Sequence, residues 1–388
     1  MRLTLSKRMK LRRFVLTAII IAHIILFNAY QVTSGSEIVE PIDEKLIMPK
    51  FAYLVIQDIA ISPDGNKIAF SINTTEKEQL LFENKNPIAK HDSIHAITYS
   101  PNGKHLAYLA YEGNNQQLIL DNRTVKKFKI KEHLDIESGK NIIEQLFKKN
   151  KLSYECIEGD PQFSPNSKRL AYVVHKYNNM ENVFVDDVEL KPFNIIINES
   201  IIFSPDSKHI AYAAVSYDST DIPKIKIILD SLEVSRYPLF TSVDKVELFL
   251  NGDIDYYNLA DFKDLTMLSD ITFSSDSKKL AYKVSQAGKE FFIIDGKQEP
   301  SYDKVYTLKF SLDNMHYAYA AVDGKKSFII RDGIKGKIYD QVYPPVFSKD
   351  SQHIYYFAKQ EKKYFLVKDQ EELNQCDGFT HFYPILSQ

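Results

Sequence analysis

The sequence predicts an all-β fold, a seven-bladed β-propeller with four antiparallel strands in each blade. Three observations carry this prediction. A turn phrase of the type found at 203–208 (Phe-Ser-Pro-Asp-Ser-Lys) occurs seven times. Most copies are 37 to 40 residues apart, with two wider gaps of 64 and 70 residues. Short apolar runs of strand length flank each copy. Such a period indicates stacked copies of one supersecondary element.

The turn phrase has the chemistry of a hairpin connection. Pro205 presets φ for the second turn position, and the side chains of Ser204 and Asp206 can bond back to the backbone. The apolar run Ile210–Ala214 that follows is the expected second strand. The serine that begins the turn is found at Ser62, Ser100, Ser164, Ser204, Ser274, Ser311 and Ser348.

The four strands of a blade are predicted from the runs around this turn. A first strand such as Val342–Phe347 leads into the turn, and a second such as Ile354–Phe357 leaves it. A third strand such as Phe291–Ile294 ends in a polar turn with Asp or Asn, and an aromatic segment such as Tyr302–Tyr306 is the expected fourth strand. One blade cannot bury both of its faces, so a closed ring is the expected arrangement.

Small and aromatic residues alternate along the second strand. We expect the alanine to let neighbouring sheets approach and the aromatic ring on the other face to fill the space between blades. The pairs are Ala69-Phe70, Ala107-Tyr108, Ala171-Tyr172, Ala211-Tyr212, Ala281-Tyr282 and Ala318-Tyr319.

The phrases FSPDSKHIAYAA, YSPNGKHLAYLA and FSPNSKRLAYVV resemble the WD40-like repeats of TolB-type propellers and of prolyl oligopeptidase relatives. The resemblance covers roughly residues 51–388 and implies a propeller. Two features of those families are not matched. Residues 31–50 are too short for the α/β domain that precedes the TolB propeller, and the Gly-x-Ser-x-Gly turn of the peptidases is missing.

The domain prediction has three parts: a leader (1–30), a polar tether (31–50) and the propeller (51–388). The two wide gaps predict insertions near 131–160 and 241–269. The first contains an apolar stripe that predicts a short helix near 139–150, and the second contains a hairpin signal at Asn251-Gly252. An eighth, degenerate blade near 241–269 is the alternative to a second insertion.

The leader predicts export. Residues 1–13 hold six basic side chains and no acidic one, and Phe14–Tyr30 follows without a charge. This pattern is typical either of a signal peptide or of a signal anchor that crosses the membrane. Both place the propeller outside the cytoplasm, periplasmic or extracellular, because the basic flank stays inside. The remaining chain has 43 basic against 51 acidic residues, which argues against nucleic acid as a partner. The two cysteines, Cys156 and Cys376, lie in different repeats and are expected to stay unbonded.

No enzyme signature is present, so we expect no catalytic residue, no cofactor and no metal site. Asn251, Asp253 and Asp255 resemble the start of a calcium loop. The glycine and the glutamate that an EF-hand requires are replaced by Tyr256 and Phe262, which leaves a polar hairpin turn as the simpler interpretation.

One set of candidate binding residues precedes the second strands. We call these seven residues the basic collar: Lys67, His105, Arg169, His209, Lys279, His316 and His353. Ring symmetry places them at equivalent heights, where they form a cationic, partly pH-tunable surface for an acidic partner. The alternative is a solvated turn that nearby aspartates neutralise.

The function predicted from these observations is a non-enzymatic binding scaffold of the cell envelope, monomeric and attached to the membrane through its N-terminal segment. Its partner is expected to be a protein or another envelope component. The alternative is a propeller hydrolase or lyase with a site at the channel mouth under the insertions.

Overall fold

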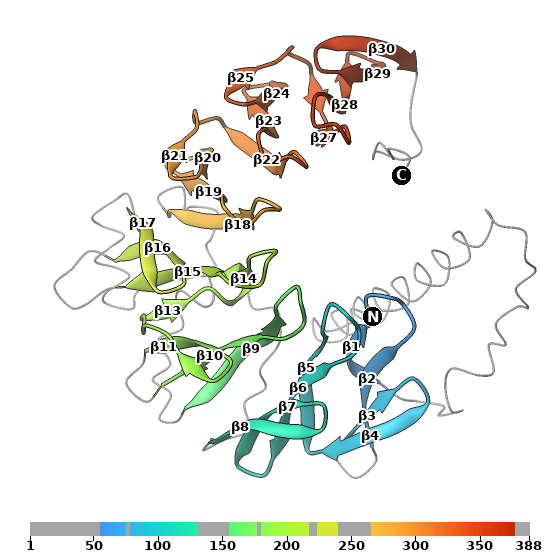
Figure 1. Ribbon diagram of the computed structural model, residues 1–388, viewed down its shortest axis with the longest axis vertical. Coiled ribbons are helices and arrows are strands. Elements are labelled where there is room, and N and C mark those ends of the chain that lie inside the picture. Colours follow the sequence, from blue (N-terminus) through green and yellow to red (C-terminus); the bar gives the residue numbers. More distant parts are fainter. Residues whose placement is uncertain are drawn as a thin grey trace, which may run out of the picture. The chain divides into compact units, whose positions relative to one another are not determined.

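Each repeated turn joins two strands of one antiparallel sheet, and the sheets follow one another along the chain (Figure 1). The computed structural model describes residues 55–74, 78–130, 155–176, 180–216, 223–239 and 265–376. They belong to the unit Tyr53–Gln388. The leader, the tether, the helix predicted near 139–150 and the Asn251-Gly252 hairpin lie outside the described residues.

Seven sheets are formed by the described residues. The strands of the first three are β1 (Ile56–Ile61), β2 (Ile68–Asn73), β3 (Gln79–Glu83), β4 (Asn86–His91), β5 (Ser93–Tyr99), β6 (Leu106–Glu112), β7 (Asn115–Leu120), β8 (Arg123–Lys129), β9 (Cys156–Phe163), β10 (Leu170–His175), β11 (Glu181–Val185) and β12 (Val188–Glu189).

The next two sheets contain β13 (Ile195–Ile196), the 3₁₀ helix η3 (Asn198–Ser200), β14 (Ile202–Phe203), β15 (Ile210–Ser216), β16 (Lys224–Leu229), β17 (Leu232–Pro238), β18 (Met267–Phe273), β19 (Leu280–Gln286), β20 (Lys289–Ile294) and β21 (Lys297–Gln298). The last two contain β22 (Lys304–Phe310), β23 (Tyr317–Asp323), β24 (Lys326–Arg331), β25 (Ile334–Lys335), β26 (Gln341–Val342), β27 (Val346–Phe347), β28 (Ile354–Gln360), β29 (Lys363–Lys368) and β30 (Glu371–Cys376).

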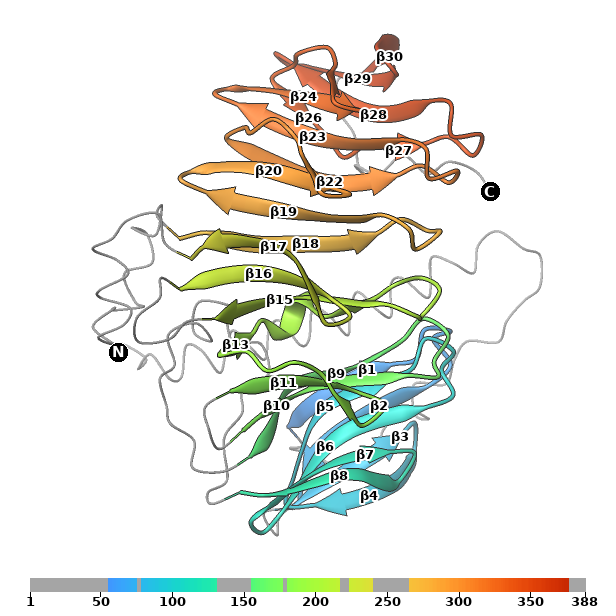
Figure 2. The same cartoon turned by 60° about the vertical axis from the view of Figure 1, so that its left-hand side comes forward.

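Every sheet consists of consecutive strands in chain order, as β18, β19 and β20 illustrate in Figure 2. In the fourth and seventh sheets the first strand is interrupted. The helix η3 separates β13 from β14, and Pro344-Pro345 separates β26 from β27. Proline has no N–H to give to a ladder, so the break at Pro344-Pro345 follows from the sequence. Among the described residues, neither the first nor the seventh sheet takes a strand from the other end of the chain.

The all-β prediction is confirmed, and the first three strands of a repeat lie where the sequence predicts them. The fourth strand was predicted only in part. Tyr302 bridges Glu290 at the outer edge of the fifth sheet, but the outer strand of that sheet is β21, and Lys304–Tyr306 already belong to β22 of the sixth sheet. The outer strand pairs over only two exposed residues, Lys297 and Gln298, which leave no apolar signal in the sequence.

The alternation of alanine and aromatic residues does pack one sheet against the next. The alanines of the second strands are fully buried. All but Ala211 lie in a hydrophobic cluster with an aromatic residue of the following sheet, and in the fourth sheet Ala213 takes this place. The cluster partners are Ala69 and Tyr108, Ala107 and Tyr172, Ala171 and Tyr212, Ala213 and Tyr282, Ala281 and Tyr319, and Ala318 and Tyr356. These six clusters join the seven sheets in sequence order.

The two serines of the turn phrase have different roles. Ser204 Oγ donates a hydrogen bond to Asp206 Oδ1 at 2.6 Å and accepts one from the His209 N–H at 2.9 Å, which closes the turn. The second serine reaches the previous sheet, as the Asp206 N–H donates to Ser277 Oγ at 2.9 Å. Equivalent bonds link Asn102 to Ser167, Asn166 to Ser207, Ser275 to Asn314 and Asp313 to Ser351. The repeated phrase therefore both shapes a turn and links neighbouring sheets through a hydrogen bond.

These turns make a pH-dependent contribution to stability. The hydrogen bond from Ser204 is the largest cause that holds the pKa of Asp206 at about 2. The pKa values of Asp276 and Asp313 are lowered in the same way by Ser274 and Ser311. An unfolded aspartate has a pKa of about 3.9, so the unfolded chain binds more protons between about pH 4 and pH 2. The stabilisation is complete above that window and is lost as pH falls through it.

Replacing Asp206, Asp276 and Asp313 together by asparagine is expected to remove part of this acid sensitivity. Asn102 and Asn166 occupy the same turn position in other copies and keep the serine bond, so the turns should persist. The urea midpoint should change little at pH 7 and fall less steeply than in the wild type between pH 4 and pH 2. Parallel declines in the two proteins would show that these carboxylates do not contribute.

Candidate functional site

The basic collar is placed at the start of the second strands, as predicted, but its charges are compensated within the fold. His209 Nδ1 lies 2.8 Å from Asp230 Oδ2, on the turn that follows the third strand of the same sheet. Lys279 Nζ donates to the Asn314 carbonyl at 2.7 Å. The remaining five residues pair in the manner of His209: Lys67 with Glu83, His105 with Asp121, Arg169 with Asp186, His316 with Asp332, and His353 with Asp369.

The acidic partner also holds the backbone. Asp230 adopts a left-handed φ of 55°, and its second oxygen accepts a hydrogen bond from the Ile210 N–H at 3.0 Å. One carboxylate thus ties the start of the second strand to the end of the third. Sequence reasoning found the cations and missed these partners, although an Asp, Asn or Glu near the end of each third strand was visible. As a partner-binding surface, the basic collar stays a prediction.

The turn of the sixth sheet differs from the other copies by exposing two apolar side chains. Leu312 is 66% exposed and Met315 is 72% exposed. At the position of Leu312 the other copies have Pro63, Pro101, Pro165, Pro205, Ser275 and Lys349. At the position of Met315 they have Asn66, Lys104, Lys168, Lys208, Lys278 and Gln352. Folding of the turn does not require these two side chains. We call Leu312 and Met315 the apolar turn.

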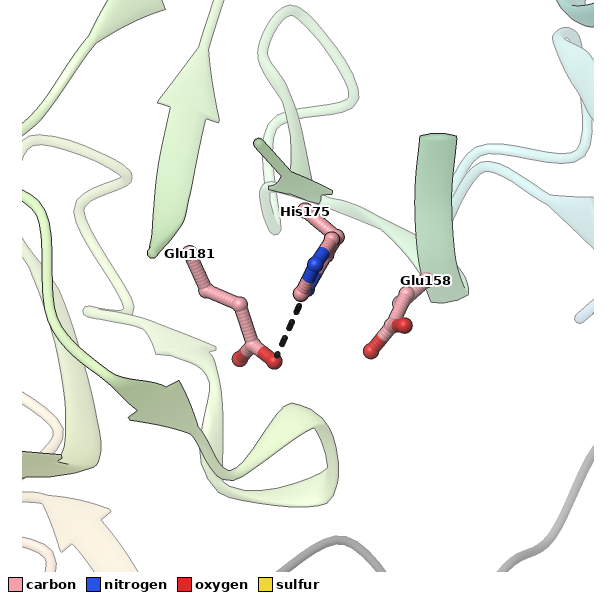
Figure 3. A group of neighbouring side chains, drawn as sticks. All are labelled: Glu158, His175 and Glu181. Carbon is pink, nitrogen blue, oxygen red and sulfur yellow. Dashed lines mark ion pairs between the residues drawn. The ribbon is translucent and has the colours of Figure 1, made fainter. Parts of the chain in front are cut away.

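A second cluster lies in the third sheet, where Glu158, His175 and Glu181 come from β9, β10 and β11 (Figure 3). The imidazole of His175 lies between the two carboxylates, with Nδ1 at 3.7 Å from Glu181 Oε1. One ligand atom from each residue lies within 4.8 Å of the others. His175 and Glu181 are 8% and 7% exposed, and Glu158 is half-buried. The antiparallel register brings the three strands together, so spacing in the sequence gave no signal for this group.

Glu181 has a second role that recurs along the chain. Its Oε2 accepts a hydrogen bond from the Ile196 N–H in the fourth sheet at 2.5 Å. At the same position of the third strand, Gln79 accepts from Ile94 at 2.7 Å, and Gln116 accepts from Ile157 at 2.6 Å. In the fifth sheet Glu290 accepts from the Val305 N–H at 3.0 Å. We call this contact the third-strand clasp.

Two carboxyl groups on first strands have raised pKa values. Burial is the main cause for Asp58 on β1, whose carboxylate accepts hydrogen bonds from the Ile59 and Ile97 N–H groups. For Asp160 on β9, which is exposed, the causes are partial desolvation and then the charge of Asp58. The two groups therefore influence each other from the first and third sheets. Raised carboxyl pKa values are typical of general acids, although structural carboxyls share them.

Cys156, at the start of β9, is buried and unbonded. Burial is the main cause that raises the pKa of its thiol, so it packs as a small apolar side chain. Within the stretches of chain that the structure describes, no helix is both long and apolar enough to cross a membrane.

No family model matches the sequence. Among solved structures, a eukaryotic initiation factor is similar with a TM-score of 0.46 and 11% identity over 86% of this chain and 78% of that one. TolB from Acinetobacter baumannii gives 0.28 and 15%, over 76% of this chain and 60% of that one. The β-propeller domain of the Trilobed protease from Pyrococcus furiosus, described as having an open velcro topology, gives 0.34 and 12% over 83% and 97%. The repeated four-stranded antiparallel sheets themselves confirm the resemblance to WD40-like propeller repeats.

Proposed function

We propose that this chain is a protein-binding β-propeller of the cell envelope, and that its partner docks on the face that carries the seven repeated turns. The exposed apolar turn carries the proposal. Leu312 and Met315 are exposed to solvent at positions where all other copies have proline or polar residues. Exposed apolar side chains that the fold does not need are typical of interaction sites, and methionine adapts its shape to a partner.

The charge around the apolar turn favours an acidic protein segment as the partner. Lys278 and Lys208, in the turns of the fifth and fourth sheets, have side chains that are 81% and 77% exposed. Their nearest acids lie 4.0 Å and 3.6 Å away, at the outer limit of an ion pair. Such exposed charges act mainly on the rate of association, and the apolar contact supplies the affinity. The collar histidines and Arg169 are already paired and would contribute less.

We further propose that the seven sheets close into a ring as the seven blades of a monomer. The first sheet has an apolar face that no other described sheet covers, with Phe70, Ile72 and Phe82 buried against one another. On the seventh sheet Tyr356 and Val367 face the sixth sheet, which leaves half-buried Tyr355 and Leu366 on the opposite face. Contact between these two faces would cover Tyr355 and Leu366, since Phe70, Ile72 and Phe82 are already buried. An eighth blade near 241–269 is the alternative, although Met267–Ser269 belong to β18 of the fifth sheet.

The leader supports a place outside the cytoplasm. Six basic side chains followed by 17 uncharged residues, Phe14–Tyr30, are typical of a signal peptide or signal anchor. A reporter enzyme that is active only after export, fused behind Gln388, is expected to be active in bacteria. An anchor would keep the fusion in the membrane fraction after alkaline washing, and a cleaved signal would release it. An inactive fusion that accumulates in the cytoplasm contradicts export.

The binding proposal is tested by quantitative capture from native envelopes with a cross-linker, using wild-type chain and the double variant Leu312→Ser with Met315→Lys. These substitutions restore the residue types of other copies, so the fold should persist. We expect the variant to capture its main partner at least about tenfold less efficiently, and wild-type capture to weaken as salt rises. A matched control exchanges the exposed but outer residues Val188 and Leu232 for serine and should leave capture unchanged. Equal capture by the double variant and the wild type contradicts the proposal.

The enzyme alternative is favoured by one observation, the raised pKa values of Asp58 and Asp160 on first strands of two sheets. In a hydrolase or lyase one of them would act as a general acid. Substituting both by asparagine should then abolish turnover of any substrate found while leaving partner capture intact, which separates the two functions.

A further inference from the structure

We propose that Glu158, His175 and Glu181 form a site for a divalent transition-metal ion that fastens the third sheet internally and to the fourth. Carboxylate oxygen combined with imidazole nitrogen suits zinc or manganese better than calcium or magnesium, which prefer oxygen ligands alone. The site is distinct from the apolar turn and does not depend on the binding function.

The geometry is close to that of a bound ion. The three ligand atoms lie within 4.8 Å of one another, and His175 Nδ1 is 3.7 Å from Glu181 Oε1. Metal–ligand bonds of about 2.1 Å in a tetrahedral site place ligand atoms about 3.4 Å apart. An inward shift of roughly 1 Å or less per side chain would complete the site. The half-buried Glu158 provides the side from which an ion and a water ligand can enter.

A comparison with the equivalent position in the fifth sheet supports the need for a cation. There, Lys304 Nζ lies 2.9 Å from Glu290 Oε1 and neutralises the clasp carboxylate. In the fourth sheet the residue before the clasp donor Ile196 is Ile195, which is buried and apolar. The third sheet thus places two carboxylates around one imidazole without a lysine at the equivalent place. Buried charges are normally paired or coordinate a metal; here the imidazole pairs with Glu181 at 3.7 Å, and a bound cation would take over that role.

The imidazole gives an independent indication. His175 Nε2 is buried and has no hydrogen-bond partner among the described side chains and backbone. Its Nδ1 is 3.7 Å from the carboxylate, longer than a hydrogen bond. A ring flip exchanges the two nitrogens, so either can face an ion. A buried imidazole nitrogen without a hydrogen-bond partner calls for an explanation, and a bound ion would provide one.

The clasp supplies the outer support that metal ligands usually have. The Ile196 N–H holds Oε2 of Glu181 at 2.5 Å, which leaves Oε1 directed toward His175. Each ligand comes from a different strand of one sheet, and Glu181 also holds the next sheet. Because His175 and Glu181 are nearly inaccessible to a substrate, an ion here is expected to stabilise the fold.

The test measures zinc binding to the full-length chain, kept in mild detergent because of its apolar leader and stripped of metal with a chelator. We expect one Zn²⁺ per chain by calorimetry and elemental analysis. At a free concentration about 100 times the Kd, the Tm should rise by about 4 °C. Variants His175→Gln and Glu181→Gln should weaken binding at least about tenfold and lose the Tm shift.

Folding of the Glu181→Gln variant is protected by the repeats, because Gln79 and Gln116 already perform the clasp in other sheets. Glu290→Gln is the matched control, since it alters the same clasp without a histidine and should bind zinc as the wild type does. His209→Gln tests whether zinc binds weakly to the surface His–Asp pairs, and this variant should not change zinc binding or the Tm shift. The proposal is overturned if the wild type binds no zinc, or if His175→Gln binds it as tightly as the wild type.

Discussion

Replacing Phe292 by alanine is expected to lower the free energy of unfolding by about 3–5 kcal/mol. Phe292 lies on β20 and is completely buried in the cluster that joins the fifth and sixth sheets. Its ring packs edge-on against Tyr319, with the centroids 5.0 Å apart. Truncation would remove a large apolar contact across this junction and leave a cavity between two sheets that share no backbone ladder.

The control for this prediction is Tyr306→Ala on β22, the same kind of truncation at a side chain that is 47% exposed. It should cost less than about 1 kcal/mol. Urea unfolding at constant pH and temperature measures both variants. Equal losses would mean that stability comes from within the sheets and not from the junction.

Replacing Gly159 by alanine is expected to lower the free energy of unfolding by about 2–5 kcal/mol. Gly159 has a φ of +71°, which an alanine adopts only with strain. An added Cβ would also lie 2.8 Å from Nδ2 and 2.9 Å from Cβ of Asn198. The Cβ of Asn198 is fixed to the backbone of η3, so the clash cannot be relieved by rotating the far end of a side chain.

Gly296→Ala separates the two causes. Gly296 has a φ of +77°, and nothing lies within 4 Å of the Cβ that it would gain. This variant carries the strain without the clash and should cost about 1–2 kcal/mol. If thermal and urea unfolding show the same loss of stability for both variants, Asn198 on η3 lies further from Gly159 on β9 than the structure indicates.

The sequence was sufficient for the repeats because turn chemistry and packing recur with the period. Ser204, Asp206 and Ala171 each perform a role that returns in most copies, so one copy explains the others. The outer strands were harder to predict, since the β21 pairing needs only two exposed residues and no apolar pattern.

The candidate sites were harder to predict, because recurrence along the chain does not reveal them. The apolar turn was visible as a departure from the repeat at Leu312 and Met315, yet a single-copy change is easily taken for drift. The cluster around His175 could not be predicted, because strand register and not spacing brings Glu158 and Glu181 to it. The basic collar was located correctly, but the carboxylates that pair with it lie 16 to 21 residues away, at or just after the end of the third strand.

Cross-linking of lysines in the monomeric protein tests the central claim that the seven sheets form one ring. Lys67 lies in the turn of the first sheet, Lys104 in that of the second and Lys349 in that of the seventh. A ring predicts a short link between Lys67 and Lys349, formed in the isolated monomer about as readily as the reference link between Lys67 and Lys104. If the reference link forms and the Lys67–Lys349 link does not, the first and last sheets are not neighbours and the ring is contradicted.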